Sequence, residues 1–125
     1  MTLPISRMTG MTAFPLLAEN LRPIPPAGVM RDPDWNLWGG GMVQTADGVC
    51  HMLLARWPRQ RGFSAWVTHS EVAWATAPAP GGPYTMQCQV MGKRQGPWWD
   101  ADNLHNPFFL EHDGLFYCYY TGNRG

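Results

Sequence analysis

Two Asp-Gly dipeptides, at 47–48 and 113–114, constrain the fold more than any other feature of this sequence. The first stands between the extended runs 39–46 and 49–57, and the second lies inside the apolar and aromatic run 105–123. Asp-Gly between such runs is a strong hairpin signal, because a type I′ turn needs positive φ at both central positions. The sequence therefore predicts two antiparallel β-hairpins.

Two further runs between the hairpins have the composition of strands. Residues 66–77 are rich in β-branched and aromatic side chains, and residues 84–92 follow the Pro- and Gly-rich turn 78–83. Apolar residues recur at a spacing of two or continuously, and Gly and Pro are frequent, so no helix is predicted.

The two Asp-Gly turns also indicate an internal repeat, since they lie 66 positions apart. At this offset Asp34 falls on Asp100, and the pair Met42 and Val43 falls on Phe108 and Phe109. A period of this size that contains four strands is typical of a β-propeller blade. The predicted fold is therefore all-β, with one four-stranded blade and the first hairpin of a second. A six-stranded β-sandwich, complete in itself, is the alternative.

Composition narrows the function. Nine basic and nine acidic residues give no net charge, which argues against a nucleic-acid or membrane partner. Seven Trp among 14 Gly and 12 Pro suit an all-β fold with an exposed aromatic surface, of the kind that binds carbohydrate. The three Cys show neither a CxxC pair nor a metal-ligand spacing, so neither a metal nor a cofactor is expected.

The chain divides into two parts. Residues 1–30 are punctuated by Pro and aperiodic, which is typical of a lead-in segment, and residues 31–125 carry the strands. Pro4, Arg7, Gly10 and Pro15 interrupt any apolar stretch near the N-terminus, so no signal peptide or membrane span is predicted. The default location is cytoplasmic, and periplasmic or secreted if the N-terminus is incomplete.

Three segments together resemble a known group of enzymes. They are WNLWGGGMVQTADGVCHMLLARWP, THSEVAWATAPAPGGPY and HNPFFLEHDGLFYCYYTGN, and they resemble the five-bladed β-propeller glycoside hydrolases, the group that includes family 43. The resemblance implies hydrolysis of a glycosidic bond in an oligo- or polysaccharide by acid/base carboxylate chemistry, with retention or inversion left open. In these enzymes the third blade supplies the general acid, so this chain would be an N-terminal fragment, not expected to be active without the remaining blades.

The resemblance also implies catalytic positions. Asp34 stands where the group has its blade-one aspartate, which acts as base or nucleophile, whereas Asp32 in its Asp-Pro pair is read as a turn former. The second-blade run, His105 to Phe108, departs from the pattern of family 43 because it lacks the aspartate. Asp100, Asp102 or His105 would then take over that role, and His105 has strand capping as its alternative.

Aromatic side chains are the candidates for sugar contact, since an indole face can stack on the C–H groups of a sugar ring. Trp66 and Trp74 are assigned to the core, and Glu71 is assigned a structural role. The predicted substrate-binding residues are Trp35, Trp38, Trp57, Trp99, Asp100 and Asn106. Two other functions stay open: a non-catalytic carbohydrate-binding propeller and a small self-contained β interaction domain.

Overall fold

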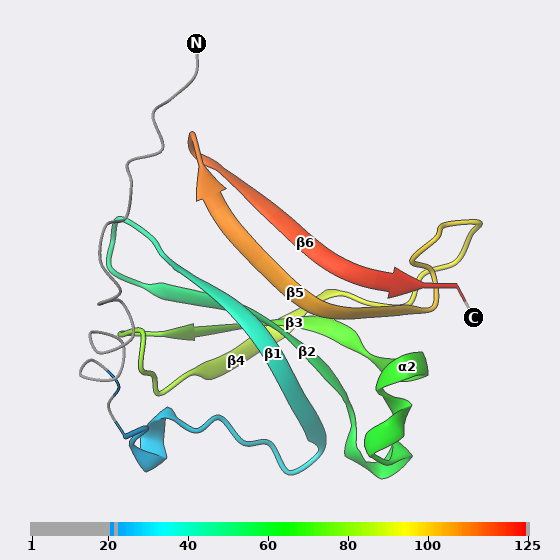
Figure 1. The fold of residues 1–125 in the computed structure, drawn as a ribbon, viewed down its shortest axis with the longest axis horizontal. Helices are drawn as coiled ribbons and strands as arrows, with labels where there is room; N and C mark the ends of the chain where they lie inside the picture. The colour runs from blue at the N-terminus through cyan, green and yellow to red at the C-terminus, as the bar shows by residue number, and fades with distance from the viewer. Residues whose placement is uncertain (1–20, 22, 125) are drawn as a thin grey trace, which may run out of the picture.

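The structure is a computed structural model that describes residue 21 and residues 23–124 (Figure 1). Most of the predicted lead-in segment, 1–20 and 22, lies outside the described residues. Its described part contains the single 3-10 turn η1 (Pro26–Gly28), which begins after Pro25. No helix among the described residues is long and apolar enough to cross a membrane.

The first sheet, called sheet A, is an antiparallel meander of four strands in chain order. Its strands are β1 (Trp35–Gln44), β2 (Cys50–Pro58), β3 (Glu71–Ala77) and β4 (Thr85–Met91). The interior strand β3 buries small side chains, which lets neighbouring elements approach it closely: Val72, Ala73, Ala75 and Ala77. The expected all-β class is confirmed.

The second sheet, called sheet B, is the hairpin of β5 (Asn103–His112) and β6 (Leu115–Asn123). Its turn has positive φ at both Asp113 and Gly114, 52° and 74°, as expected for type I′. The first hairpin closes differently: at its Asp-Gly pair only Gly48 has a positive φ, 85°. Asp47 instead accepts a hydrogen bond from the backbone N–H of Val49. The hairpin prediction at 47–48 is right and the turn type is wrong.

A helical connection joins β2 to β3, where the sequence predicted only strand. It consists of the 3-10 turns η2 (Arg59–Arg61) and η3 (Phe63–Ala65), followed by the short helix α2 (Trp66–His69). The predicted strand 66–77 is therefore wrong over its first part. The reason is pairing: the ladder between β2 and β3 ends at the pair Arg56 and Glu71, so residues before Glu71 have no strand partner.

Sheet B lies across one face of sheet A, with β5 beside β1 and β2 (Figure 1). Phe109 of β5 is buried, and its ring lies 6.1 Å from that of Phe116. On the facing side, His51 stacks on Trp74 at 5.7 Å and accepts the hydrogen bond of the indole N–H. Aromatic rings from both sheets therefore take part in the contact between them.

Gly41 allows the closest approach between the two sheets. A Cβ atom at this position would lie 3.0 Å from the Cα of Phe108 and 3.1 Å from the backbone nitrogen of Phe109. Any larger residue would push β5 away from β1, so the glycine sets the separation of the sheets at this point.

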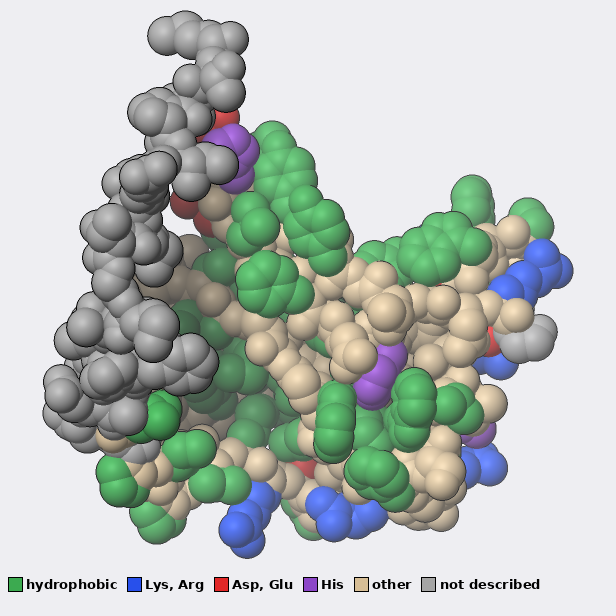
Figure 2. Space-filling model, viewed as in Figure 1, with side chains coloured by type: hydrophobic (Ala, Val, Ile, Leu, Met, Phe, Trp, Pro, Cys, Tyr) green, Lys and Arg blue, Asp and Glu red, His purple; other side chains and the backbone are tan. Residues whose placement is uncertain are grey.

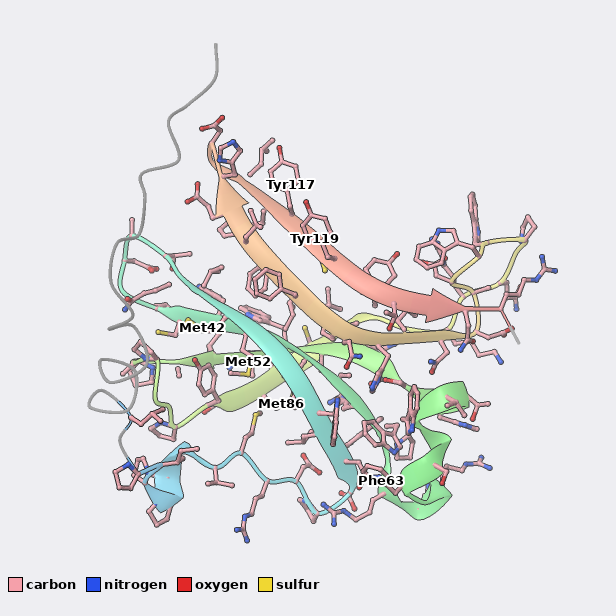
Figure 3. All side chains as sticks on the ribbon, in the orientation of Figure 1. Met42, Met52, Phe63, Met86, Tyr117 and Tyr119 are labelled. Carbon is pink, nitrogen blue, oxygen red and sulfur yellow. The ribbon has the colours of Figure 1, made fainter. Side chains whose placement is uncertain are left out.

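The other side of sheet B is an exposed apolar surface, which we call its outer face. Hydrophobic side chains gather there over β5 and β6 (Figure 2), and Tyr117 and Tyr119 point away from sheet A (Figure 3). The exposed residues of the outer face are Leu110, Leu115, Tyr117 and Tyr119. On the far face of sheet A, Met42 of β1 pairs with Met52 of β2, and Met86 of β4 lies beyond Ala75 of β3 in the same row.

Candidate functional site

A cavity with aromatic walls lies where the start of β1, the connection between β2 and β3, and β5 meet. Its volume is about 340 Å³, and we call it the aromatic cavity. It is lined by Trp38, Trp57, Phe63, Trp66, His105 and Asn106. No charged carboxylate, ammonium or guanidinium group belongs to this lining, so the cavity suits an uncharged ligand with an apolar face.

The rings of the cavity brace one another. Phe63 meets Trp38 and Trp57 edge to face, at centroid distances of 6.1 and 5.7 Å. Trp57 is 1% exposed and forms the buried wall, whereas Trp38 and Trp66 are 51% and 40% exposed. Two indole faces are therefore held by fixed neighbours and still open to solvent, an arrangement that can take a flat apolar surface without a large loss of side-chain freedom.

Two β-bulges bring the polar side of the cavity into place. The register of β1 shifts at Gly39, and that of β5 shifts between His105 and Phe108. Gly39 and Asn106 both have positive φ, 49° and 48°. A bulge inserts one residue and re-aims the side chains near it, which turns Asn106 toward the cavity at the point where β5 crosses β1.

His105 is the one titratable residue of the lining, and it is held on several sides. Its Nδ1 lies 2.8 Å from Oγ of Ser70, and its ring lies 4.9 Å from Trp66 and 5.7 Å from Trp57. The residue is 5% exposed, and this burial lowers the pKa of His105 below its ordinary 6.5. At neutral pH the imidazole is therefore uncharged.

The predicted catalytic carboxylates lie outside the aromatic cavity. Asp34 is exposed and lines a separate cavity of about 450 Å³ beside Arg59. Asp102 lines a polar cleft of about 360 Å³ together with Glu71, and an oxygen of Asp102 lies 3.1 Å from Nζ of Lys93. Of the predicted catalytic set, the structure brings only His105 to the aromatic rings.

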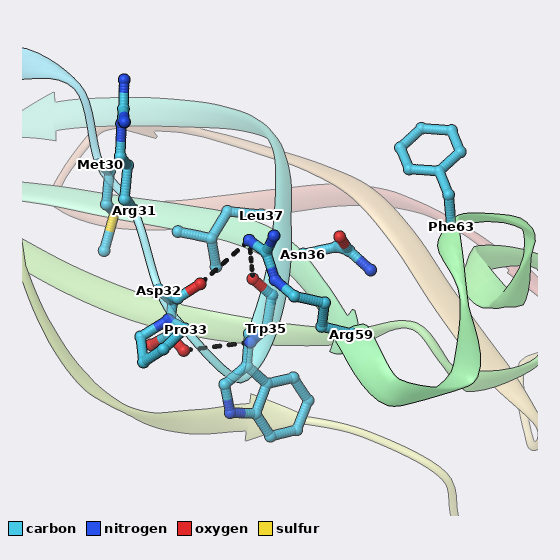
Figure 4. Close-up of a pocket in the computed structure, with 9 residues that line it drawn as sticks. All are labelled: Met30, Arg31, Asp32, Pro33, Trp35, Asn36, Leu37, Arg59 and Phe63. Carbon is cyan, nitrogen blue, oxygen red and sulfur yellow. Dashed lines mark hydrogen bonds between the residues drawn. The ribbon is translucent and has the colours of Figure 1, made fainter.

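Asp32 supports a turn, as its Asp-Pro context predicted. Its Oδ1 accepts hydrogen bonds from the backbone N–H groups of Asp34 and Trp35, at 2.8 and 3.0 Å. Arg59 completes this corner, because its Nη2 donates to the carbonyl oxygens of Asp32 and Trp35 (Figure 4). The cavity of about 560 Å³ drawn there is walled by Met30, Arg31, Asp32, Pro33, Trp35, Asn36, Leu37, Arg59 and Phe63.

Asp100 and Trp99 belong to the connection between β4 and β5. The carboxylate of Asp100 is buried; it accepts a hydrogen bond from Arg94 and another, at 2.7 Å, from the hydroxyl of Tyr120. The Arg94 guanidinium, and after it the Tyr120 hydroxyl, holds the pKa of Asp100 below its ordinary value. Trp99 stacks on Tyr120 at 5.5 Å. This group fastens the connection to β6.

Trp35 lies on the far side of sheet A from the aromatic cavity. The guanidinium of Arg56 sits 4.1 Å above its ring and is paired with Glu71 at 2.7 Å. Of the six predicted substrate-binding residues, Trp38, Trp57 and Asn106 meet at the aromatic cavity, whereas Trp35, Trp99 and Asp100 do not.

Three residues of the site escaped sequence reasoning. Phe63 and Ser70 were not considered, and Trp66 was assigned to the core. The spacing from Phe63 to Trp66, directly after Gly62, would have been the available signal for a helical turn that presents both rings on one side.

No family model matches the chain, and no curated protein matches it either.

Proposed function

We propose that this chain is part of a glycoside hydrolase of the five-bladed propeller type, and that the aromatic cavity holds a sugar ring of its substrate. The observation that carries the proposal is the pairing of two exposed indole faces with His105 and Asn106 in one uncharged cavity. Sugar rings combine apolar C–H faces with a rim of hydroxyl groups. The indole faces of this lining can stack on the C–H groups, and its polar side chains can form hydrogen bonds with the hydroxyl groups.

The chemistry of binding follows from the lining. Trp38 and Trp66 offer faces for stacking, and the amide of Asn106 can both donate to and accept from hydroxyl groups. His105 adds a neutral polar group at the buried end. A cavity without a positive charge gives no advantage to acidic sugars, so a neutral sugar is the expected ligand.

Equivalent faces of the two sheets support the propeller architecture. Counted from the bulges, Val43, His51 and Leu53 of sheet A correspond to Leu110, Tyr117 and Tyr119 of sheet B. The first three residues line the contact with sheet B, and the second three are exposed. The face of sheet A that contacts sheet B therefore has an equivalent face on sheet B, which is exposed and open to a further sheet. Radially repeated blades require such a repeated contact.

The proposed catalytic roles rest on the resemblance, since both carboxylates line cavities other than the aromatic one. Asp34 remains the proposed base or nucleophile, and Asp102 the proposed second carboxylate. Hydrolysis needs one carboxyl group that gives a proton and one that accepts a proton or attacks. The general acid is proposed to come from a third blade.

Binding is tested first. Tryptophan fluorescence of the protein is titrated with a panel of neutral oligosaccharides that differ in sugar and linkage. Trp66→Ala should weaken binding at least tenfold, because it removes one stacking wall. Trp98→Ala is the matched control, since Trp98 is also an exposed tryptophan but lies outside the cavity. Equal affinity of both variants would refute the aromatic cavity as the sugar site.

Hydrolysis is tested separately with chromogenic aryl glycosides. Asp34→Asn should abolish turnover while oligosaccharide binding persists, because the carboxylate lies away from the aromatic walls. Unchanged turnover in this variant would remove Asp34 from the mechanism.

A non-catalytic carbohydrate-binding protein is the second candidate function. It is favoured by one observation: no carboxylate lines the aromatic cavity among the described residues. Oligosaccharide binding without release of a chromophore from any aryl glycoside would select this function over the hydrolase.

A further inference from the structure

We infer that Ser70 is a positioning residue that fixes His105 as the Nε2–H tautomer, so that the aromatic cavity presents a neutral N–H donor to an oxygen atom of its ligand. This inference deepens the proposed function and rests on it for the identity of the ligand. The assignment of the tautomer itself rests only on contacts within the chain.

Ser70 is held rigidly at the junction of the two sheets. Its backbone N–H donates to Oδ1 of Asn103 at 2.7 Å, and its carbonyl accepts from the backbone N–H of Leu104 at 3.2 Å. The residue is 2% exposed. Ser70 is therefore held by one side chain and one backbone group of β5, the strand that also carries His105.

The proton of the Ser70 hydroxyl decides the tautomer. Among the described residues, the only partner within hydrogen-bond distance of Oγ is Nδ1 of His105, at 2.8 Å. If Nδ1 carried the proton and donated to Oγ, the buried O–H of Ser70 would have no acceptor, which is costly. If Ser70 donates, Nδ1 accepts and the proton of the neutral imidazole lies on Nε2.

The rings around His105 keep this orientation. The rings of Trp66 and Trp57 both pack against the imidazole, at 4.9 and 5.7 Å, and this packing opposes its rotation about χ2. Burial also favours the neutral imidazole. With Nδ1 used by Ser70, Nε2–H is the group that remains for a ligand in the cavity.

The role of His105 changes accordingly. A protonated Nε2 cannot accept a proton, and Nδ1 is occupied by Ser70, so the neutral residue does not act as a general base. It donates a hydrogen bond to a hydroxyl or ring oxygen of the sugar. His105 is thus a specificity residue of the cavity rather than a source of catalytic protons.

The experiment is a long-range ¹H–¹⁵N correlation spectrum of the imidazole groups in the ligand-free protein at neutral pH. The four His side chains are assigned through their backbone resonances. The expected result is a single neutral Nε2–H tautomer for His105, with a hydrogen-bonded Nδ1. A predominant Nδ1–H tautomer, or a charged imidazolium, would overturn the inference.

Two variants separate positioning from packing. Ser70→Ala should convert the His105 signal to a mixture of tautomers, while Ser70→Thr, which keeps the hydroxyl, should restore the Nε2–H form. An unchanged tautomer in a folded Ser70→Ala protein would also refute the role of Ser70. If that variant does not fold, the wild-type spectrum and the Ser70→Thr spectrum still decide the question.

The outcome is distinguishable from failure of the proposed function. An Nε2–H tautomer together with no binding of the neutral oligosaccharide panel would refute the sugar site and leave the role of Ser70 intact. Binding of the panel together with the Nδ1–H tautomer would support the sugar site and refute the role of Ser70.

Discussion

Gly39 of β1 and Asn106 of β5 are the extra residues of two β-bulges that lie beside each other at the rim of the aromatic cavity. Their φ angles are 49° and 48°, and a Cβ atom on Gly39 would lie 3.4 Å from Oδ1 of Asn106. Two hairpins with little sequence identity thus bend at the same place, and their bend creates the cavity.

The first prediction concerns this pair. Gly39→Ala should lower the free energy of unfolding by about 1–2 kcal/mol, because a side chain disfavours left-handed φ. Asn106→Gly tolerates the same φ, so it should preserve stability while removing the amide from the cavity. Urea denaturation of both variants checks the first effect, and oligosaccharide titration of Asn106→Gly checks the second. Loss of stability in Asn106→Gly alone would contradict the bulge argument.

Gly41 should be intolerant of any side chain for a different reason. Gly41→Ala would place a methyl group against the backbone of β5, and overpacking of this kind costs about 1–3 kcal/mol. Gly81→Ala is the control, since a Cβ at Gly81 meets nothing within 4 Å. Thermal denaturation should show a lower midpoint for Gly41→Ala and little change for Gly81→Ala.

Phe109 should dominate the contact between the sheets. Phe109→Ala removes a buried ring and should cost about 3–5 kcal/mol. Tyr119→Ala truncates an aromatic residue on the outer face of sheet B, where the ring is exposed. It should therefore change the free energy of unfolding only slightly. Comparable losses for the two variants in denaturant titration would show that the outer face is covered in solution.

The free energy of unfolding should fall as the pH drops through the pKa of His105. Burial lowers the pKa of His105 below 6.5, so the imidazole stays neutral until the pH drops through that lowered value. As the pH falls below 6.5, His105 takes up a proton in the unfolded chain before it does so in the folded chain. Its contribution to the free energy of unfolding therefore declines as the pH falls. The groups facing His105, Ser70, Trp57 and Trp66, carry no charge. Urea denaturation at a series of pH values between about pH 8 and pH 5 tests this, with His112→Gln as control.

The connection between β4 and β5 should open only at low pH. Arg94 and Tyr120 lower the pKa of Asp100, so its contribution to stability is present above the ordinary value of 3.8 and is lost as the pH falls through the lowered value. Tyr120→Phe removes one of the two partners and should move the acid transition to higher pH. Trp99 fluorescence reports the opening, because Trp99 stacks on Tyr120. An unshifted transition in Tyr120→Phe would argue against this role.

Local signals in the sequence were sufficient for the strands. Asp113 and Gly114 specify a two-residue turn through their own backbone preferences, so the second hairpin is predictable without knowledge of its partners. The segment 66–69 is different. Its β-branched residues favour strand, but it has no neighbouring strand to pair with, and the chain folds into α2 instead.

The aromatic cavity could be predicted only in part. Trp38, Trp57 and Asn106 were named from residue type, because indole and amide groups suit sugar contact anywhere in a chain. Trp66 and Ser70 were missed, since their contacts with His105 join positions more than 30 residues apart in sequence. The same holds for Asp100. Its carboxylate suggested a catalytic or substrate-binding role, whereas its hydrogen bonds with Arg94 and Tyr120 give it a structural role.

The sequence by itself determined the strands, the two hairpins, the abundance of aromatic residues and the net neutrality of the chain. Turn propensity and alternation are properties of neighbouring residues, and the sequence contains them in full. The tertiary structure decided where β5 crosses β1, which bulges face each other, and which rings surround His105. These are contacts between distant segments, and their geometry depends on backbone approach at Gly41 and on burial, neither of which a local pattern encodes.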